Sequence, residues 1–136
     1  MSNDANVRRF QVELADVIRN RVPAQAAVIM QKIALQALQG VVRASPVDTG
    51  RFRGNWQMQA GTPATGVLDR LDPSGSAALA AGESVIAQAT IDAPLWLTNN
   101  VPYAGRLEDG HSDQAPEGVL GITVERLRSQ FGRTRL

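Results

Sequence analysis

The residues best suited to chemistry lie between Glu108 and Gln114, around the single histidine of the chain, His111. The run G-H-S-D-Q from Gly110 to Gln114 looks like a nucleophile elbow, where a serine between two glycines follows a buried strand. Here Gln114 replaces the second glycine, and the lone His adjoins the Ser instead of lying elsewhere in the chain. We therefore expect no acyl-transfer chemistry at this run.

A metal or phosphate site is also not expected. Glu108, Asp109, His111 and Asp113 are close in sequence, but their spacing matches no metal geometry, and cysteine is absent. The only lysine, Lys32, lies within a helical pattern without the preceding glycines of a phosphate-binding loop. The sequence thus predicts a protein that is not an enzyme and has no cofactor.

Three short elements must position these residues between Ile91 and Pro116. Leu95, Trp96 and Leu97 stand between turn signals and predict a short buried strand. Pro102 starts a new element, and the residues from Tyr103 to Glu108 predict one or two helical turns. Asp109-Gly110 should end this helix, because glycine accepts the left-handed conformation that closes helices. A polar loop then runs to Pro116.

Two segments carry a family resemblance. The run N-N-V-P-Y-A-G-R-L-E-D-G-H-S-D-Q-A-P at 99–116, together with S-P-V-D-T-G-R-F-R-G-N-W at 45–56, resembles the tail-completion or neck proteins of long-tailed bacteriophages. These proteins are often described simply as tail components. The two segments cover about thirty residues and keep the order found in that family.

The resemblance implies a virion structural protein at the head-tail junction. Copies would form a ring around the DNA channel, a hexamer by family analogy or alternatively a dodecamer. The implied partners are other neck and tail proteins, namely the head-side connector or stopper and the tail terminator or tail tube. DNA would pass through the lumen without sequence recognition, and no membrane would be involved. The chain would be made in the host cytoplasm.

The rest of the chain predicts mainly helices. Apolar residues from Val7 to Ile18 recur at spacings of three and four, and Pro23 either kinks that helix or starts the next. The other expected elements are a helix at 24–44, a short helix at 51–55, a strand at 56–60 paired with the strand around Trp96, an Ala-rich helix at 77–89 and a final helix within 118–131.

Some apolar surface could need cover from outside the domain. The helix at 24–44 carries two apolar rows, which either the domain itself or a partner subunit covers. The loops at 61–75 and 110–118 are expected to become ordered only against neighbouring subunits or rings. Within the first loop, the patch from Val67 to Leu71 either docks on another chain or packs locally.

Composition narrows the class of protein. The chain has 136 residues, 43% hydrophobic and 4% aromatic, which suits one domain with an aliphatic core. Thirteen Arg and one Lys face thirteen acidic residues, so net charge gives no strong nucleic-acid signal. No apolar run approaches the roughly 18 residues of a membrane span, and the polar N-terminus is unlike a signal peptide.

We predict an α+β fold with long N-terminal helices and a C-terminal helix packed on a small antiparallel sheet, with long loops. The expected single domain, 1–136, has N-terminal helices at 4–44, a strand-loop-helix-strand unit at 51–98, a short helix and loop at 102–118 and a C-terminal helix at 119–131.

Contact residues are the predicted functional sites. Arg106 and Glu108, and likewise Asp48 and Arg51, are expected to form ion pairs within or between chains. The alternative function is a nucleic-acid-binding module that uses the four Arg residues within 126–136. The predicted interface residues are Asp48, Arg51, Tyr103, Arg106, Glu108, His111, Gln114, Arg126 and Arg128.

Overall fold

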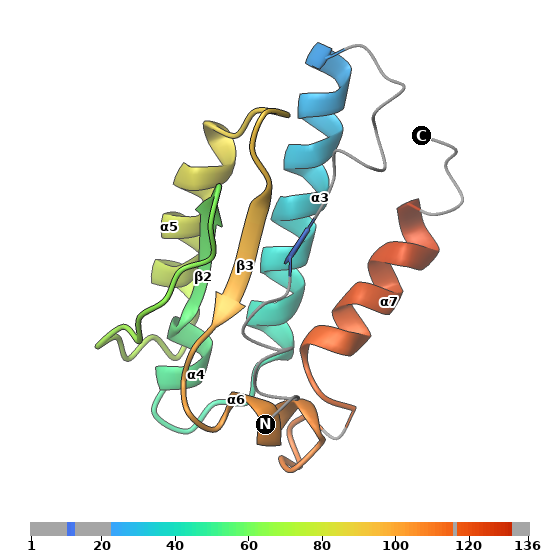
Figure 1. The fold of residues 1–136 in the computed structure, drawn as a ribbon. Coiled ribbons are helices and arrows are strands. Elements are labelled where there is room, and N and C mark those ends of the chain that lie inside the picture. Colours follow the sequence, from blue (N-terminus) through green and yellow to red (C-terminus); the bar gives the residue numbers. More distant parts are fainter. Residues whose placement is uncertain (1–10, 13–22, 116, 132–136) are drawn as a thin grey trace.

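The computed structural model describes residues 11–12, 23–115 and 117–131. In this part of the chain, five helices accompany a small antiparallel sheet, which confirms the predicted α+β fold (Figure 1). The elements in chain order are β1 (Gln11–Val12), α3 (Pro23–Ala44), α4 (Arg51–Gly54), β2 (Trp56–Ala60), α5 (Ser76–Ala87), β3 (Leu95–Asn99), α6 (Ala104–Glu108) and α7 (Leu120–Phe131).

The sheet has β3 at its centre, in the order β1-β3-β2, and both pairings are antiparallel. Met58 lies opposite Leu97 in the β2–β3 pair, so the predicted pairing of these two strands is confirmed. Trp56 and Met58 are buried, whereas the alternate residues Gln57 and Gln59 are half-buried. This period of two directs the apolar side chains of β2 toward the helices.

The first strand corrects one prediction. Gln11 and Val12 pair with Trp96 and Leu95 of β3, so the helix expected across these two residues is wrong. The other residues of that expected helix lie outside the described part of the chain. Pro23 begins α3, as expected for proline in the first turn of a helix.

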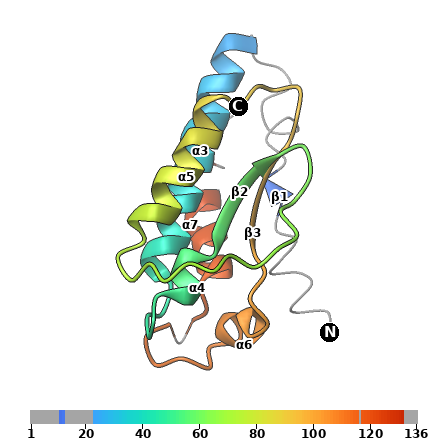
Figure 2. The same ribbon diagram turned by 90° about the vertical axis from the view of Figure 1, so that its left-hand side faces the viewer.

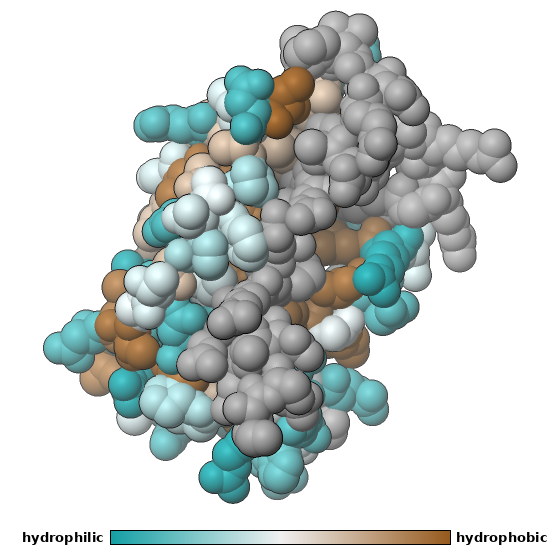
Figure 3. All heavy atoms as spheres, viewed as in Figure 1, coloured by the Kyte–Doolittle hydropathy of each residue, from teal (hydrophilic) through white to brown (hydrophobic). Residues whose placement is uncertain are grey.

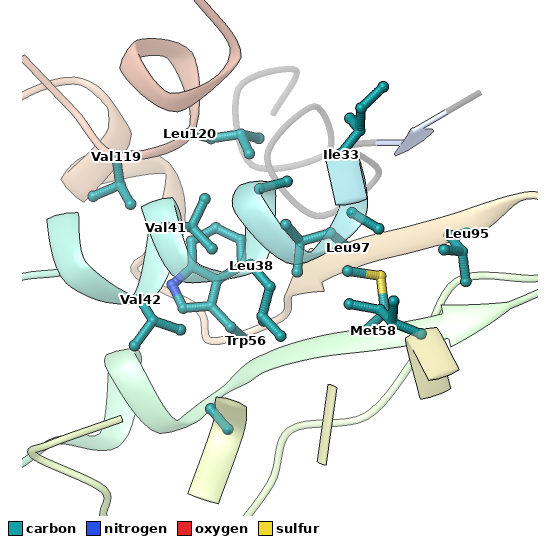
Figure 4. Close-up of a cluster of buried hydrophobic side chains, with 14 of the residues drawn as sticks. Ile33, Leu38, Val41, Val42, Trp56, Met58, Leu95, Leu97, Val119 and Leu120 are labelled. Carbon is teal, nitrogen blue, oxygen red and sulfur yellow. The ribbon is translucent and has the colours of Figure 1, made fainter. Parts of the chain in front are cut away.

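Helix α3 lies at the centre of the fold and is covered by the domain itself. Figure 2 shows α3 and α5 on one side of the sheet, and α7 packs against α3. Figure 4 shows Trp56 beside α3, with Val119 and Leu120 approaching this helix from the α7 side. The buried residues of α3 are Ala26, Met30, Ile33, Ala34, Ala37, Leu38, Val41 and Val42. Of the two alternatives for its apolar rows, cover by the chain's own elements is therefore confirmed.

Small residues bring α5 close to α3. A Cβ atom on Gly82 would lie 2.4 Å from Cδ2 of Leu38, a residue that is fully buried. Gly82 thus lets the two helix backbones approach each other closely. The cost of glycine within a helix, about 1 kcal/mol, is offset here by this packing.

The loop between β2 and α5 is held by its own chain. Asn55 Nδ2 donates to the carbonyl of Leu68 at 3.1 Å, and the Leu68 amide donates back to Asn55 Oδ1 at 2.7 Å. Gln57 Nε2 donates to the Gly66 carbonyl at 2.8 Å, and Asn100 Nδ2 donates to the Ala64 carbonyl at 2.8 Å. The expectation that this loop becomes ordered only against neighbouring subunits is therefore wrong.

Two side chains of this loop remain exposed. Val67 retains 43% and Leu71 66% of their possible solvent exposure, although the backbone between them is fixed at Leu68. Local packing is thus confirmed for the backbone of this patch, and docking of its two exposed apolar side chains on another chain stays a prediction. As for membranes, no helix within the described ranges has the length and apolar character to cross a bilayer.

Candidate functional site

The two segments that carry the family resemblance meet in space, at the end of the molecule where α4 and α6 lie (Figure 1). Asn99 Nδ2 donates to the carbonyl of Phe52 at 2.9 Å, and both residues are buried. The Phe52 ring lies 6.3 Å from the Tyr103 ring and 5.6 Å from the Trp56 ring, measured between centroids. A buried amide and an aromatic cluster therefore join segments 45–56 and 99–116 into one surface.

Gln114 provides a second link between these segments. Its Oε1 accepts from the Val47 amide at 2.8 Å, and its Nε2 donates to the Val47 carbonyl at 3.0 Å. The side-chain amide thus pairs with both backbone groups of one residue, as a neighbouring strand would. The Ser112 hydroxyl accepts from the Gln114 amide at 3.2 Å. The 110–118 loop is therefore also held by its own chain, contrary to the expectation of an open loop.

Sequence reasoning missed the residues that support this surface. Trp56 Nε1 donates to the Ser45 hydroxyl at 2.7 Å, and that hydroxyl donates to the Val41 carbonyl at 2.5 Å. Arg53 donates to the carbonyls of Ser45 and Pro73, each at 2.8 Å. A buried tryptophan needs a hydrogen-bond acceptor for its indole N–H group, so the sequence could have indicated a nearby hydroxyl such as that of Ser45. No local sequence pattern indicated the role of Arg53.

The joined segments enclose a pocket, which we name the Tyr103 pocket. Its volume is about 230 Å³, and it is lined by residues 46–52, Tyr103, Leu107, Ser112 and Gln114. Small-molecule sites usually begin at roughly 300 Å³. The Tyr103 pocket is thus better matched to one or two side chains of a protein partner than to a substrate.

Four of the predicted contact residues therefore gather around one pocket. Asp48, Arg51 and Gln114 are exposed, and Tyr103 is half-buried. No ion pair joins Asp48 to Arg51 within the described structure, and a pair between chains stays a prediction. Both charged groups are therefore available to a partner.

Arg106 and His111 are exposed near the pocket without lining it. The carbonyl of Arg106 accepts from the His111 amide at 3.2 Å, which closes the end of α6. No ion pair joins Arg106 to Glu108 within the described residues either, and a pair between chains stays a prediction.

Glu108 instead binds the N-terminus of α7. Its Oε1 accepts from the amides of Val119 at 3.0 Å and Leu120 at 2.6 Å, and its Oε2 accepts from the Gly121 amide at 2.7 Å. The first turn of a helix leaves amide donors without intrahelical partners, and its dipole favours an anion there. The structure thus gives this carboxylate a role within the chain, where we expected an interface contact.

No family model, curated protein or solved structure matches this chain. The family resemblance therefore remains a prediction based on the two segments.

The described residues contain no group of three His, Asp or Glu side chains that could hold a metal ion.

Arg126 and Arg128 lie on α7, away from the residues that line the Tyr103 pocket. Arg128 contacts Glu125 at 3.4 Å, and the two side chains are 74% and 73% exposed. Exposed pairs of this kind contribute only about 0–1 kcal/mol. Arg126 lines a groove of about 450 Å³ between α3 and α7, together with Gln36, Gln39, Gly40, Arg43, Ala44, Thr123, Leu127 and Gln130.

Proposed function

We propose that this chain is a structural protein of the bacteriophage head-tail junction. Copies form a ring around the DNA channel, hexameric by family analogy or otherwise dodecameric, and join the tail to the head connector. The ring contacts other neck and tail proteins, and DNA passes through it without sequence recognition. The protein is thus located in the virion and needs no catalytic group or cofactor.

The observation that carries this proposal is the meeting of segments 45–56 and 99–116. These segments suggested the family from sequence, and Asn99, Phe52 and Gln114 hold them together as one surface. That surface presents the exposed charges of Asp48 and Arg51 around a pocket of about 230 Å³. An aromatic side chain and an arginine at the edge of a pocket are typical anchors of protein interfaces.

The first test compares particles made with and without the protein. Without it, we expect full heads and finished tails that do not join, as seen by electron microscopy of purified lysates. Supplying Tyr103→Ala should lower the yield of joined particles by about thirtyfold, which corresponds to roughly 2 kcal/mol at one interface anchor.

Glu83→Ala, an exposed change on α5, is the matched control and should restore full joining. Circular dichroism of both variants checks that they fold. Normal yields of joined, infectious particles in the absence of the protein would exclude the proposed function.

A second candidate, a nucleic-acid-binding module, is favoured by the α3–α7 groove. Arg43 and Arg126 are exposed and line it from different helices, and no acidic residue is among its lining. The C-terminal Arg133 and Arg135 lie outside the described residues. If both arginines bind phosphates, the affinity for duplex DNA should fall by about twelvefold between 50 and 200 mM salt.

Binding of the purified protein to duplex DNA distinguishes these candidates. For a junction protein we expect weak binding that changes by less than about threefold when Arg43 and Arg126 are both replaced by Ala. Arg106→Ala is the control, because it removes an exposed positive charge that does not line the groove. Tight, strongly salt-dependent binding that only the double variant loses would favour the nucleic-acid module.

A further inference from the structure

Two apolar side chains of the loop between β2 and α5 stay exposed in the part of the chain that the structure describes. Val28, Val67 and Leu71 are the large hydrophobic side chains that stay exposed among the described residues, and two of them belong to this loop. Figure 3 shows apolar side chains at the surface on the lower left, where Figure 1 has this loop. We call Val67 and Leu71 the loop patch.

The loop patch is held in place before any partner arrives. The backbone of Leu68 is fixed by Asn55, and the Asp72 amide donates to the Gly50 carbonyl at 3.1 Å. Arg70 Nη1 also donates to the Gly54 carbonyl at 3.3 Å. A contact surface that is already ordered loses little conformational entropy on binding. The loop patch is thus suited to insert into a pocket.

We propose that the loop patch of one copy inserts into the Tyr103 pocket of a second copy. This inference rests on the proposed ring and names the surfaces that would form it. The pocket is lined by the apolar groups of Phe52, Tyr103 and Leu107, and its volume of about 230 Å³ suits aliphatic side chains.

Charges at the edges of the two surfaces are complementary. Asp69 is exposed beside the loop patch, and Arg51 is exposed at the pocket. Because Asp48 also lines the pocket, the orientation that brings Asp69 and Arg51 together keeps the two carboxylates apart. The second copy therefore supplies both the apolar side chains and the matching charge.

The contact joins different surfaces of two identical copies. Residues 46–52 line the pocket, and Gly50 in the same segment contacts Asp72 and Pro73, which follow the loop patch. The loop patch and the Tyr103 pocket are thus separate surfaces that both border segment 46–52. A contact between unlike surfaces of identical copies repeats from copy to copy, and it closes into a ring when the rotation allows.

The experiment measures the oligomers of the purified full chain by native mass spectrometry and sedimentation. The unchanged protein should form species larger than dimers, whereas Leu71→Asp should weaken self-association by at least about hundredfold. Val28→Asp places the same charge on another exposed apolar residue and should leave the oligomers intact. Arg51→Asp should also reduce association, and adding Asp69→Arg to that variant should restore it.

Mixing two defective variants tests the head-to-tail arrangement. Leu71→Asp keeps its pocket and Arg51→Asp keeps its loop patch, so an equal mixture should form one-to-one dimers and nothing larger. Self-association that survives both Leu71→Asp and Val67→Asp, or a monomer at every concentration, would overturn this inference. Head-tail joining in the particle experiment would then still support the proposed function, so the two failures are distinguishable.

Discussion

Replacing Gly50 with Ala is expected to lower the free energy of unfolding by at least about 3 kcal/mol. Gly50 has a φ of 88°, and a Cβ atom there would lie 2.4 Å from the Pro73 nitrogen and 2.7 Å from the Asp72 carbonyl carbon. Both neighbours are backbone atoms, which cannot turn away as a side chain can. Urea unfolding monitored by tryptophan fluorescence measures the loss.

Gly61 offers a matched control for this change. Its φ is 89°, and nothing lies within 4 Å of the place where its Cβ would be. Gly61→Ala therefore adds only the strain of a left-handed backbone, about 1–2 kcal/mol. Equal losses of unfolding free energy in the two variants would show that the close approach of backbone atoms to Gly50 does not contribute to stability.

The effect of Gly50 should extend to the candidate site. Its carbonyl accepts from the Gly54 amide at 2.9 Å and from the Asp72 amide at 3.1 Å, so it starts α4 and holds the end of the β2–α5 loop. The same residue lines the Tyr103 pocket. A shift of Gly50 would therefore move the loop patch and the pocket relative to each other.

The main elements of the fold were predictable because their signals are local. Apolar rows at helical spacing marked α3 and α7, Ala-rich composition marked α5, and alternation marked β2. Pro23 and Gly110 gave useful boundaries, since proline suits the first turn of a helix and glycine accepts positive φ. Strand β1 was missed because two residues are too few to show a period of two.

The anchoring of the loops was not predictable in the same way. Asn55 binds Leu68, and Gln114 binds Val47, through pairs that are far apart in the chain. A side-chain amide shows no preference in sequence for a particular distant backbone group. Long polar loops were therefore expected to be open, whereas side-chain amides such as the buried Asn55 and the exposed Gln114 hold them.

The candidate site was predicted in part. Asp48, Arg51, Tyr103 and Gln114 were named as contact residues, and the structure places them around one pocket, which the sequence did not predict. Ion pairs between close neighbours in sequence were expected from proximity alone, and the described structure forms neither of them. Short sequence separation does not ensure contact, because exposed charges gain little from pairing and lose side-chain freedom.

Burial within the chain also changes how a ring would form. The central helix is already covered and both loops are already fixed, so assembly needs no large folding step. The surfaces proposed for the ring contact are the loop patch of Val67 and Leu71 and the Tyr103 pocket. Ring contacts of this kind depend on the match between two formed surfaces, and a single apolar residue such as Leu71 then has a large effect.

Glu108→Ala is expected to lower the free energy of unfolding by about 2–3 kcal/mol, because three amides of the α7 N-terminus lose one charged acceptor. Glu108→Gln should have a smaller effect, since an amide keeps one acceptor oxygen but presents an N–H group to the remaining donor. Thermal and urea unfolding of both variants measure this order.

A second carboxylate near the start of α7 provides a control that distinguishes the hydrogen bonds of Glu108 from the effect of negative charge alone. Glu117 is exposed and lies just before α7, so Glu117→Ala should change stability by no more than about 0.5 kcal/mol. Amide hydrogen exchange should locate the damage from Glu108→Ala at Val119, Leu120 and Gly121, whose donors become free. Similar losses of stability in the Glu108 and Glu117 variants would mean that a negative charge near the helix dipole is sufficient to stabilise the N-terminus of α7. The three hydrogen bonds of Glu108 would then contribute little.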